Sequence, residues 1–228
     1  MLFLLIGQSN MAGRGPLSAA PSPPHSRVFM LTKELQWAPA QDPLHFDKPE
    51  IVGVGPGLSF GLEIAARNGS GLIGLVPAAF GGSSLDEWQP GSAHYAAAVL
   101  RARAALSNGK LAGILWHQGE ADSNPAKAAT YARRFGVMIA QLRLDLDAPN
   151  LPVIVGETGV FRPAGEAINA VLAGLPGQIP HCAFVSAGGL TDKGDRVHFD
   201  SASQRELGQR YARAWLELTA ASETGSGR

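Results

Sequence analysis

Five short apolar runs recur along the chain, each of strand length and apolar at nearly every position. They cover residues 2–6, 72–78, 111–116, 151–155 and 183–186. Continuous rather than alternating hydrophobicity is typical of strands buried on both faces. Stretches with helical character follow them, at 58–68, 93–106, 126–146, 166–172 and 201–221. This alternation predicts an α/β fold of three layers, with helices on both faces of a parallel central sheet of about five strands.

The domain organisation that this pattern predicts is simple. With 228 residues, 45% of them hydrophobic, the chain can bury one full core, so we expect a single domain over residues 1–221. The small and polar residues 222–228 are expected to form a disordered tail. Residues 19–57 are rich in proline and fit no repeating pattern, which predicts an irregular insertion with one hairpin.

Charge and composition exclude some partners. Lys+Arg and Asp+Glu are both 19 and form no basic cluster, so we expect no nucleic acid partner. The apolar start of the chain is too short to cross a membrane and has no basic leader, so we interpret it as a core strand and expect no membrane association. Without a visible signal peptide the expected location is the cytoplasm, although a secreted mature domain would look the same. The lone Cys182 fits a reduced, buried thiol, and the oligomeric state is left open.

Ligands of parallel sheets bind outside the carboxyl ends of the strands, so the loops that follow the strands are the places to look for chemistry. Ser9 follows the first strand directly, where the amide groups of a helix start would favour developing negative charge. A serine there is either a nucleophile or an ordinary helix cap. The other loops are residues 79–88, 117–123, 156–163 and 187–200.

Asp195 and His198 follow the last strand and supply what a serine nucleophile needs. A histidine base removes the serine proton, and an acid fixes the histidine tautomer. Three residues apart on one loop, the carboxylate can turn back to the ring Nδ1 while Nε2 faces Ser9. By itself, an aspartate three residues before a histidine is also typical of a surface ion pair. Glu157 follows another predicted strand and is an alternative or supporting acid.

Acyl transfer also needs donors for the tetrahedral oxyanion. The glycine pair in residues 79–84 lets backbone amide groups approach a substrate, or forms a plain turn. Gln118 ends the third strand with a side-chain amide that can donate. His117 and Glu120 beside it have no further ligands at metal-binding spacing, so we expect no metal and assign Glu120 to bracing the loop through backbone amide groups.

Four blocks in order give the chain its resemblance to a known family. They are Gly7-Gln8-Ser9-Asn10-Met11, Gly81-Gly82-Ser83-Ser84 with Trp88, His117-Gln118-Gly119-Glu120 and Asp195-Arg196-Val197-His198. The chain resembles the SGNH (GDSL-like) hydrolase superfamily over most of its length. More narrowly, it resembles the carbohydrate esterase branch of acetylxylan esterases and sialic acid O-acetylesterase-like domains.

The resemblance implies a flavodoxin-like α/β/α fold and a reaction without metal or cofactor. It implies Ser9 as nucleophile, His198 as base and Asp195 as the acid that orients it. The implied oxyanion hole consists of the amide groups of Ser9 and Gly82 with the Gln118 side chain, where the wider superfamily has asparagine.

The function expected from these observations is removal of acetyl groups from a sugar or polysaccharide, such as acetylxylan, through an acyl-enzyme intermediate. Trp88 and Trp116 are either stacking surfaces for the sugar or core residues. A lipase- or thioesterase-like hydrolase of the same superfamily is an alternative, as is a carbohydrate-binding domain without turnover. Residues 7–13 lack both the lysine and the glycine spacing of a phosphate-binding loop, so we expect no phosphate site there.

Overall fold

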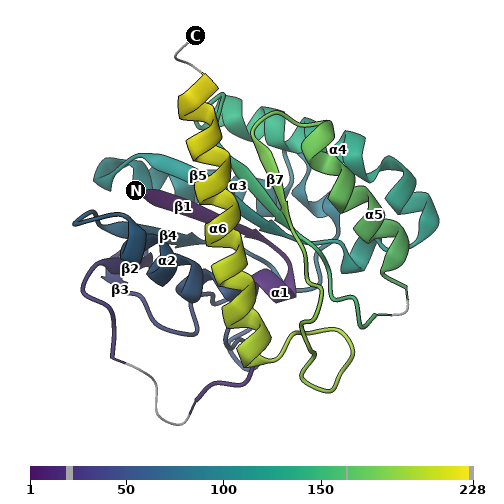
Figure 1. Cartoon of the computed structure of the whole chain (residues 1–228), viewed down its shortest axis with the longest axis horizontal. Coiled ribbons are helices and arrows are strands. Elements are labelled where there is room, and N and C mark those ends of the chain that lie inside the picture. The colour runs from purple at the N-terminus through teal and green to yellow at the C-terminus, as the bar shows by residue number, and fades with distance from the viewer. Residues whose placement is uncertain (19–22, 163, 226–228) are drawn as a thin grey trace.

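A computed structural model describes residues 1–18, 23–162 and 164–225. Residues 19–22, 163 and 226–228 fall in the predicted insertion, the fourth loop and the tail, and lie outside the described residues. The centre of the molecule is a seven-stranded sheet in the order β3-β2-β4-β1-β5-β6-β7 (Figure 1). All neighbouring strands are parallel except the pair β2 and β3. The strands are β1 (Leu2–Gly7), β2 (Val28–Leu31), β3 (Trp37–Pro39), β4 (Ile73–Pro77), β5 (Leu111–His117), β6 (Val153–Gly156) and β7 (Cys182–Val185).

The five predicted parallel strands are confirmed, but the expected strand number of about five is too low. The predicted hairpin in the insertion is present as β2 and β3, and it joins the sheet because β2 pairs with β4 in parallel. Residues 28–31, which form β2, are continuously apolar like the predicted strands, but the proline-rich segment around them fits no repeating pattern and so predicts no further strand of the sheet.

Helices cover both faces of the sheet, because its strands are apolar on both sides. In β1 the side chains of Leu2, Leu4 and Ile6 pack on one face, and those of Phe3 and Leu5 pack on the other. The first face lies under α3 (Ala93–Ala105), α4 (Pro125–Asp145) and α5 (Glu166–Gly174). The second face lies under α2 (Pro56–Arg67) and the long α6 (Ser201–Gly225), which crosses the front of the sheet in Figure 1.

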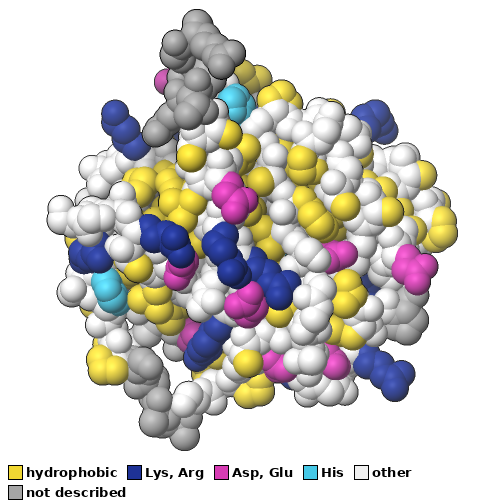
Figure 2. Space-filling view, in the orientation of Figure 1, with side chains coloured by type: hydrophobic (Ala, Val, Ile, Leu, Met, Phe, Trp, Pro, Cys, Tyr) yellow, Lys and Arg dark blue, Asp and Glu magenta, His cyan; other side chains and the backbone are white. Residues whose placement is uncertain are grey.

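The helix α6 differs from the prediction at its end and carries mixed charge. It continues to Gly225, so residues 222–225, which we expected in a disordered tail, are helical. Glu206 on this helix accepts hydrogen bonds from Arg210 and Arg213, and in Figure 2 acidic and basic side chains lie beside one another on this face of the molecule. Among the described residues, no helix combines the length and apolar character needed to span a bilayer.

The order of the strands places the ends of three of them together. Without β2 and β3, the parallel strands follow the flavodoxin-like order in which β1 is flanked by the next two parallel strands along the chain, β4 and β5. After β1 the chain therefore places β4 on one side of β1 and then β5 on its other side. The carboxyl end of β1 is the switch point at which such folds bind ligands.

Candidate active site

Ser9 lies at this switch point, in the first turn after β1. It opens α1 (Ser9–Ala12), a single helical turn, and its side chain is nearly buried. The residue before it is tied to the neighbouring strand, because the Gln8 backbone amide donates to the His117 carbonyl at 2.8 Å. The position of the hydroxyl is therefore set by the centre of the sheet.

Asp195, His198 and Ser9 form a continuous hydrogen-bonded series. The ring Nε2 of His198 lies 3.0 Å from Ser9 Oγ, and its Nδ1 lies 2.7 Å from Asp195 Oδ2. The other Asp195 oxygen accepts the backbone amides of Val197 and His198, at 2.9 and 2.8 Å. The carboxylate is thus fixed by its own loop, and residues from opposite ends of the chain meet in the order that acyl transfer by serine needs.

The Asp195 carboxyl group stays ionised at neutral pH. Partial burial acts to raise its pKa, but the hydrogen bonds from the His198 backbone and ring and from the Val197 amide lower the pKa to about 2. A charged carboxylate at Nδ1 holds the proton there and leaves Nε2 free to accept one from Ser9.

Asn10 joins the serine turn to the loop that carries His198, and no reading of the sequence gave it a role. Its Nδ2 donates to Glu120 Oε1 at 2.6 Å and to the Val197 carbonyl at 3.0 Å. Its Oδ1 accepts the Phe199 backbone amide at 3.2 Å. The predicted bracing role of Glu120 is therefore exerted through this side-chain amide and not through backbone amides.

His117 is buried beneath the site and, among the described residues, makes no hydrogen bond to Ser9. Tyr211 donates its hydroxyl proton to the Trp116 carbonyl, so we infer that it accepts the Nδ1 proton of His117 at 3.1 Å. Burial lowers the pKa of His117, although Glu120 and Glu157 act to raise it. We interpret it as a neutral core histidine.

The glycine turn after β4 presents an unpaired backbone amide at the same edge of the sheet. The Ser83 amide donates to the Phe80 carbonyl at 3.3 Å, and Gly82 takes the third position of the turn with φ +84°, a conformation that favours glycine. Phe80 N donates to the Gly7 carbonyl at 3.0 Å, which holds the turn beside the serine. Among the described residues, neither the Ser9 nor the Gly82 amide has a partner, so both can donate to an oxyanion.

Gln118 does not fit the oxyanion role that the resemblance implied. Its Nε2 donates to Asp122 Oδ2 at 2.7 Å and to the Ser83 carbonyl at 3.2 Å, while its Oε1 accepts the Tyr131 hydroxyl at 2.7 Å. The carboxylate partner fixes which end of the amide is the donor. With both hydrogens used and 0% of the residue exposed, Gln118 instead braces the glycine turn from below.

Glu157, the other candidate acid, has no hydrogen bond to His198 in the described part of the chain and instead contacts the residues that follow β7. Its Oε2 accepts the Ser186 hydroxyl at 2.8 Å and the Ala187 amide at 2.7 Å. It also lines a cavity of about 550 Å³ with Phe161, Arg162 and Asn169. Phe161 packs edge-to-face on Phe199, the residue after His198, whereas Ser9, Asp195 and His198 do not line this cavity.

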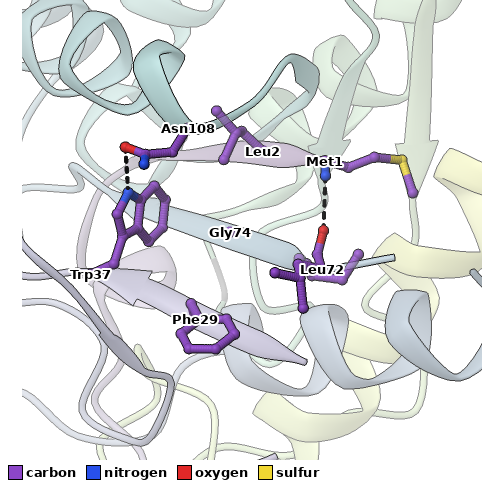
Figure 3. Close-up of a pocket in the computed structure, with 8 residues that line it drawn as sticks. Met1, Leu2, Phe29, Trp37, Leu72, Gly74 and Asn108 are labelled. Atoms are coloured by element: carbon purple, nitrogen blue, oxygen red, sulfur yellow. Dashed lines mark hydrogen bonds between the residues drawn. The ribbon is translucent and has the colours of Figure 1, made fainter. Parts of the chain in front are cut away.

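Trp88 and Trp116, expected either as stacking surfaces or as core, are core residues. They are 1% and 0% exposed and pack edge-to-face with ring centroids 5.4 Å apart. A different tryptophan, Trp37, lines a cavity of about 370 Å³ at the opposite, amino-terminal edge of the sheet, where its Nε1 donates to Asn108 (Figure 3). None of the residues that line this second cavity is a nucleophile or an acid. Across the described parts of the chain, no cluster of three potential metal ligands occurs.

A family model and a protein of known structure are similar to this chain over most of its length. A family model described as "Carbohydrate esterase, sialic acid-specific acetylesterase" matches residues 1–217. A probable carbohydrate esterase of Arabidopsis thaliana is 33% identical over 235 residues, which cover 94% of this chain and 90% of that protein. The X-ray structure of the Arabidopsis protein has a TM-score of 0.87 at 33% identity, with 95% of this chain and 97% of that chain covered.

Two more distant crystal structures share the fold. That of NanS has a TM-score of 0.79 at 20% identity and covers 96% of this chain and 97% of its own. That of a carbohydrate acetylesterase from Xanthomonas citri has a TM-score of 0.73 at 20% identity, covering 96% of this chain and 57% of that one. At this identity the likeness shows the fold alone.

Proposed function

Because the chain belongs to the carbohydrate esterase family of sialic acid-specific acetylesterases, whose members are carboxylic ester hydrolases, we propose that it removes acetyl groups from sugar hydroxyls with Ser9 as nucleophile. The observation that carries the proposal is the Asp195–His198–Ser9 series, with its distances of 2.7 and 3.0 Å. The order of donors and acceptors in it is the one that activates a serine hydroxyl.

In the first half of the reaction, Ser9 Oγ attacks the acetyl carbonyl carbon and gives its proton to His198 Nε2. The carbonyl π electrons move to oxygen, and the resulting oxyanion accepts hydrogen bonds from the Ser9 and Gly82 amides. Collapse of this intermediate breaks the bond to the sugar oxygen, which takes the proton from His198. The free sugar hydroxyl leaves, and Ser9 carries the acetyl group.

In the second half, His198 Nε2 takes a proton from a water molecule as its oxygen attacks the acetyl carbon. The same two amides donate to the second oxyanion, and Ser9 Oγ leaves and takes the proton back from His198. Acetic acid is released and ionises to acetate by losing its proton to solvent. Asp195 stays ionised throughout and stabilises the imidazolium that forms twice per turnover. No metal or cofactor enters this cycle.

The sugar part of the substrate has a candidate place in the cavity beside Phe161. Arg162 and Glu157 supply charged groups, and Phe161 supplies an apolar surface. Such a mixture is typical of sites that bind polar ligands in one orientation. We propose two substrate types for comparison: an acetylated polysaccharide such as acetylxylan, and an O-acetylated sialic acid. As a separate proposal, the protein is located in the cytoplasm.

The test is acetate release from acetylated xylan, an O-acetylated sialic acid and p-nitrophenyl acetate. Wild type is compared with Ser9→Ala, Asp195→Ala and Glu157→Ala. We expect release that requires Ser9 and depends strongly on Asp195, with p-nitrophenyl acetate turnover little changed by Glu157→Ala. Retained activity in Ser9→Ala would contradict the mechanism. Binding of acetylated glycan without acetate release would favour a non-catalytic binding domain, and preference for long acyl chains would favour a lipase- or thioesterase-like hydrolase.

A further inference from the structure

A buried ion pair lies against the glycine turn and has no part in the reaction described above. Arg14 Nη2 and Asp47 Oδ2 are 2.7 Å apart, and each side chain is only 2% exposed. Arg14 comes from the segment directly after α1, and Asp47 comes from the irregular insertion. The pair therefore joins the segment that follows Ser9 to the irregular insertion.

The pair holds the glycine turn through a backbone amide. The same Asp47 oxygen that meets Arg14 also accepts the Gly81 amide at 2.7 Å. The second terminal nitrogen of the same guanidinium, Arg14 Nη1, donates to the Gly13 carbonyl at 2.7 Å. A continuous path thus runs from the segment after Ser9, through two charged side chains, to the residue before Gly82.

The fit around Gly81 leaves no room for a side chain. A Cβ atom on Gly81 would lie 2.3 Å from Arg14 Nη2 and 2.8 Å from Asp47 Oδ2. The glycine therefore allows the pair to approach the turn more closely than any other residue would. The position of the Gly81 amide is set by the pair, and the next amide along the chain is that of Gly82.

Stability alone is a weak reason to bury these charges. Removing two charges from water is costly, and well-packed apolar residues commonly replace a buried pair without loss of stability. Burial acts to raise the pKa of Asp47, but hydrogen bonding to and charge attraction from Arg14, together with the Gly81 amide, lower it, so the carboxylate is charged at neutral pH. An ionised carboxylate holds a backbone amide more firmly than a neutral acceptor would.

We propose that Arg14 and Asp47 are positioning residues that fix the Gly82 amide relative to Ser9 and so preorganise the oxyanion hole. This inference rests on the proposed function. An oxyanion donor stabilises charge only if it is already in place when the charge develops, and removing one such donor typically costs about 10²–10³ in kcat. The pair acts on this donor from outside the site and touches no reacting atom.

The experiment compares kcat and KM for p-nitrophenyl acetate in Asp47→Ala, Asp47→Asn and Gly81→Ala, with Ser9→Ala as the inactive reference. Asp47→Ala frees the turn, so we expect kcat to fall about 100-fold, the scale of a displaced catalytic group, while KM changes little. Asparagine keeps an oxygen that can accept the Gly81 amide, so Asp47→Asn should recover at least about ten-fold of that loss. Gly81→Ala displaces the turn while both charges remain and should lower kcat as Asp47→Ala does.

A matched control separates positioning from stability. Arg143 is also a buried arginine, 7% exposed against 4% for Arg14, and it donates to the Leu151, Pro180 and His181 carbonyls, with no hydrogen bond to a residue of the site among the described residues. Arg143→Lys should lower the melting temperature. At temperatures where this variant is folded, its kcat should equal that of wild type. Inhibition by a small boronic acid, which forms a tetrahedral adduct on the serine, should weaken in Asp47→Ala in parallel with kcat.

Two outcomes overturn the inference. If folded Asp47→Ala keeps wild-type kcat and boronic acid affinity while Ser9→Ala is inactive, the pair is structural only and the proposed function stands. If Asp47→Asn loses as much activity as Asp47→Ala, the hydrogen bond from the Gly81 amide to residue 47 does not determine kcat. Activity that persists in Ser9→Ala would instead refute the proposed function itself.

Discussion

Replacing Asn10 with alanine removes the side chain that joins the serine turn to the histidine loop. Asn10 is fully buried, and its amide makes four hydrogen bonds. Its Nδ2 donates to Glu120 Oε1 and to the Val197 carbonyl, and its Oδ1 accepts the Phe199 amide and, at 3.4 Å, Gln204 Nε2. Alanine has no side-chain group that can satisfy these partners.

The expected loss follows from the partners that are left behind. The bond to the Glu120 carboxylate is short and charge-assisted, which puts it at about 1.5–3 kcal/mol. The two backbone groups at Val197 and Phe199 add about 1 kcal/mol each, and the long bond to Gln204 adds little. The free energy of unfolding should therefore fall by about 3–5 kcal/mol, a large part of the 5–15 kcal/mol typical of a domain.

The assay is urea unfolding followed by circular dichroism, with Asn169→Ala as the matched control. Asn169 is also buried and makes three hydrogen bonds, but all of them go to uncharged groups of Thr158. We expect Asn169→Ala to cost about 2–3 kcal/mol, less than Asn10→Ala. Because His198 lies between the two residues that Asn10 holds, kcat should also fall, by about 100-fold if the ring shifts by 1 Å.

The result that would refute this reasoning is a loss below about 1 kcal/mol for Asn10→Ala, or a smaller loss than that of Asn169→Ala. Either would mean that Glu120 and the histidine loop find other partners when the amide is removed. If Asn10→Ala lost this much stability but kept wild-type kcat under conditions where it is folded, the Asn10 hydrogen bonds would stabilise the fold without positioning His198.

Three further predictions concern single groups. Asp195→Asn turns an amide donor toward His198 Nδ1 and favours the wrong tautomer, so kcat for p-nitrophenyl acetate should fall by about 10³–10⁴, whereas Glu157→Gln should keep it; equal losses would contradict the assignment of the acid. The pKa of Asp195 in the folded protein, about 2, lies below the value of about 3.9 for an unfolded chain, so its contribution to stability is complete above pH 4 and is lost as pH falls from about 4 to about 2. Acid titrations of wild type and Asp195→Asn followed by circular dichroism should diverge in that window, and parallel curves would argue against it. Burial raises the pKa of the Cys182 thiol to about 12, so a disulfide reagent at pH 8 should label it only after unfolding, and rapid labelling of the folded protein would show an accessible thiolate.

The parallel strands and the meeting of Ser9 with His198 could be predicted because both depend on local pattern. Each buried strand is apolar throughout, and a motif that directly follows such a strand must lie at the carboxyl edge of the sheet. The Asp195–His198 bond was predictable for the same reason, since only three residues separate the two side chains on one loop.

Other features depend on contacts between distant parts of the chain that no local pattern records. Gln118 was expected to face the substrate, but Asp122 and Tyr131 take up its amide once the helix α4 packs against β5. Asp47 lies in a segment without periodicity, and its partner Arg14 is more than thirty residues away, so nothing in the sequence pairs them. The hairpin of β2 and β3 was expected, but its place at the edge of the sheet depends on pairing with β4.

The central claim is that His198 activates Ser9 as the nucleophile, and covalent labelling tests it most directly. The protein is treated with diethyl p-nitrophenyl phosphate, which transfers a diethylphosphoryl group to activated serines, and the modified peptide is identified by mass spectrometry while esterase activity is followed. We predict one group per chain, on Ser9, gained in step with the loss of activity and strongly slowed in His198→Ala. Loss of activity with the label on another residue, or full activity with Ser9 labelled, would contradict the account.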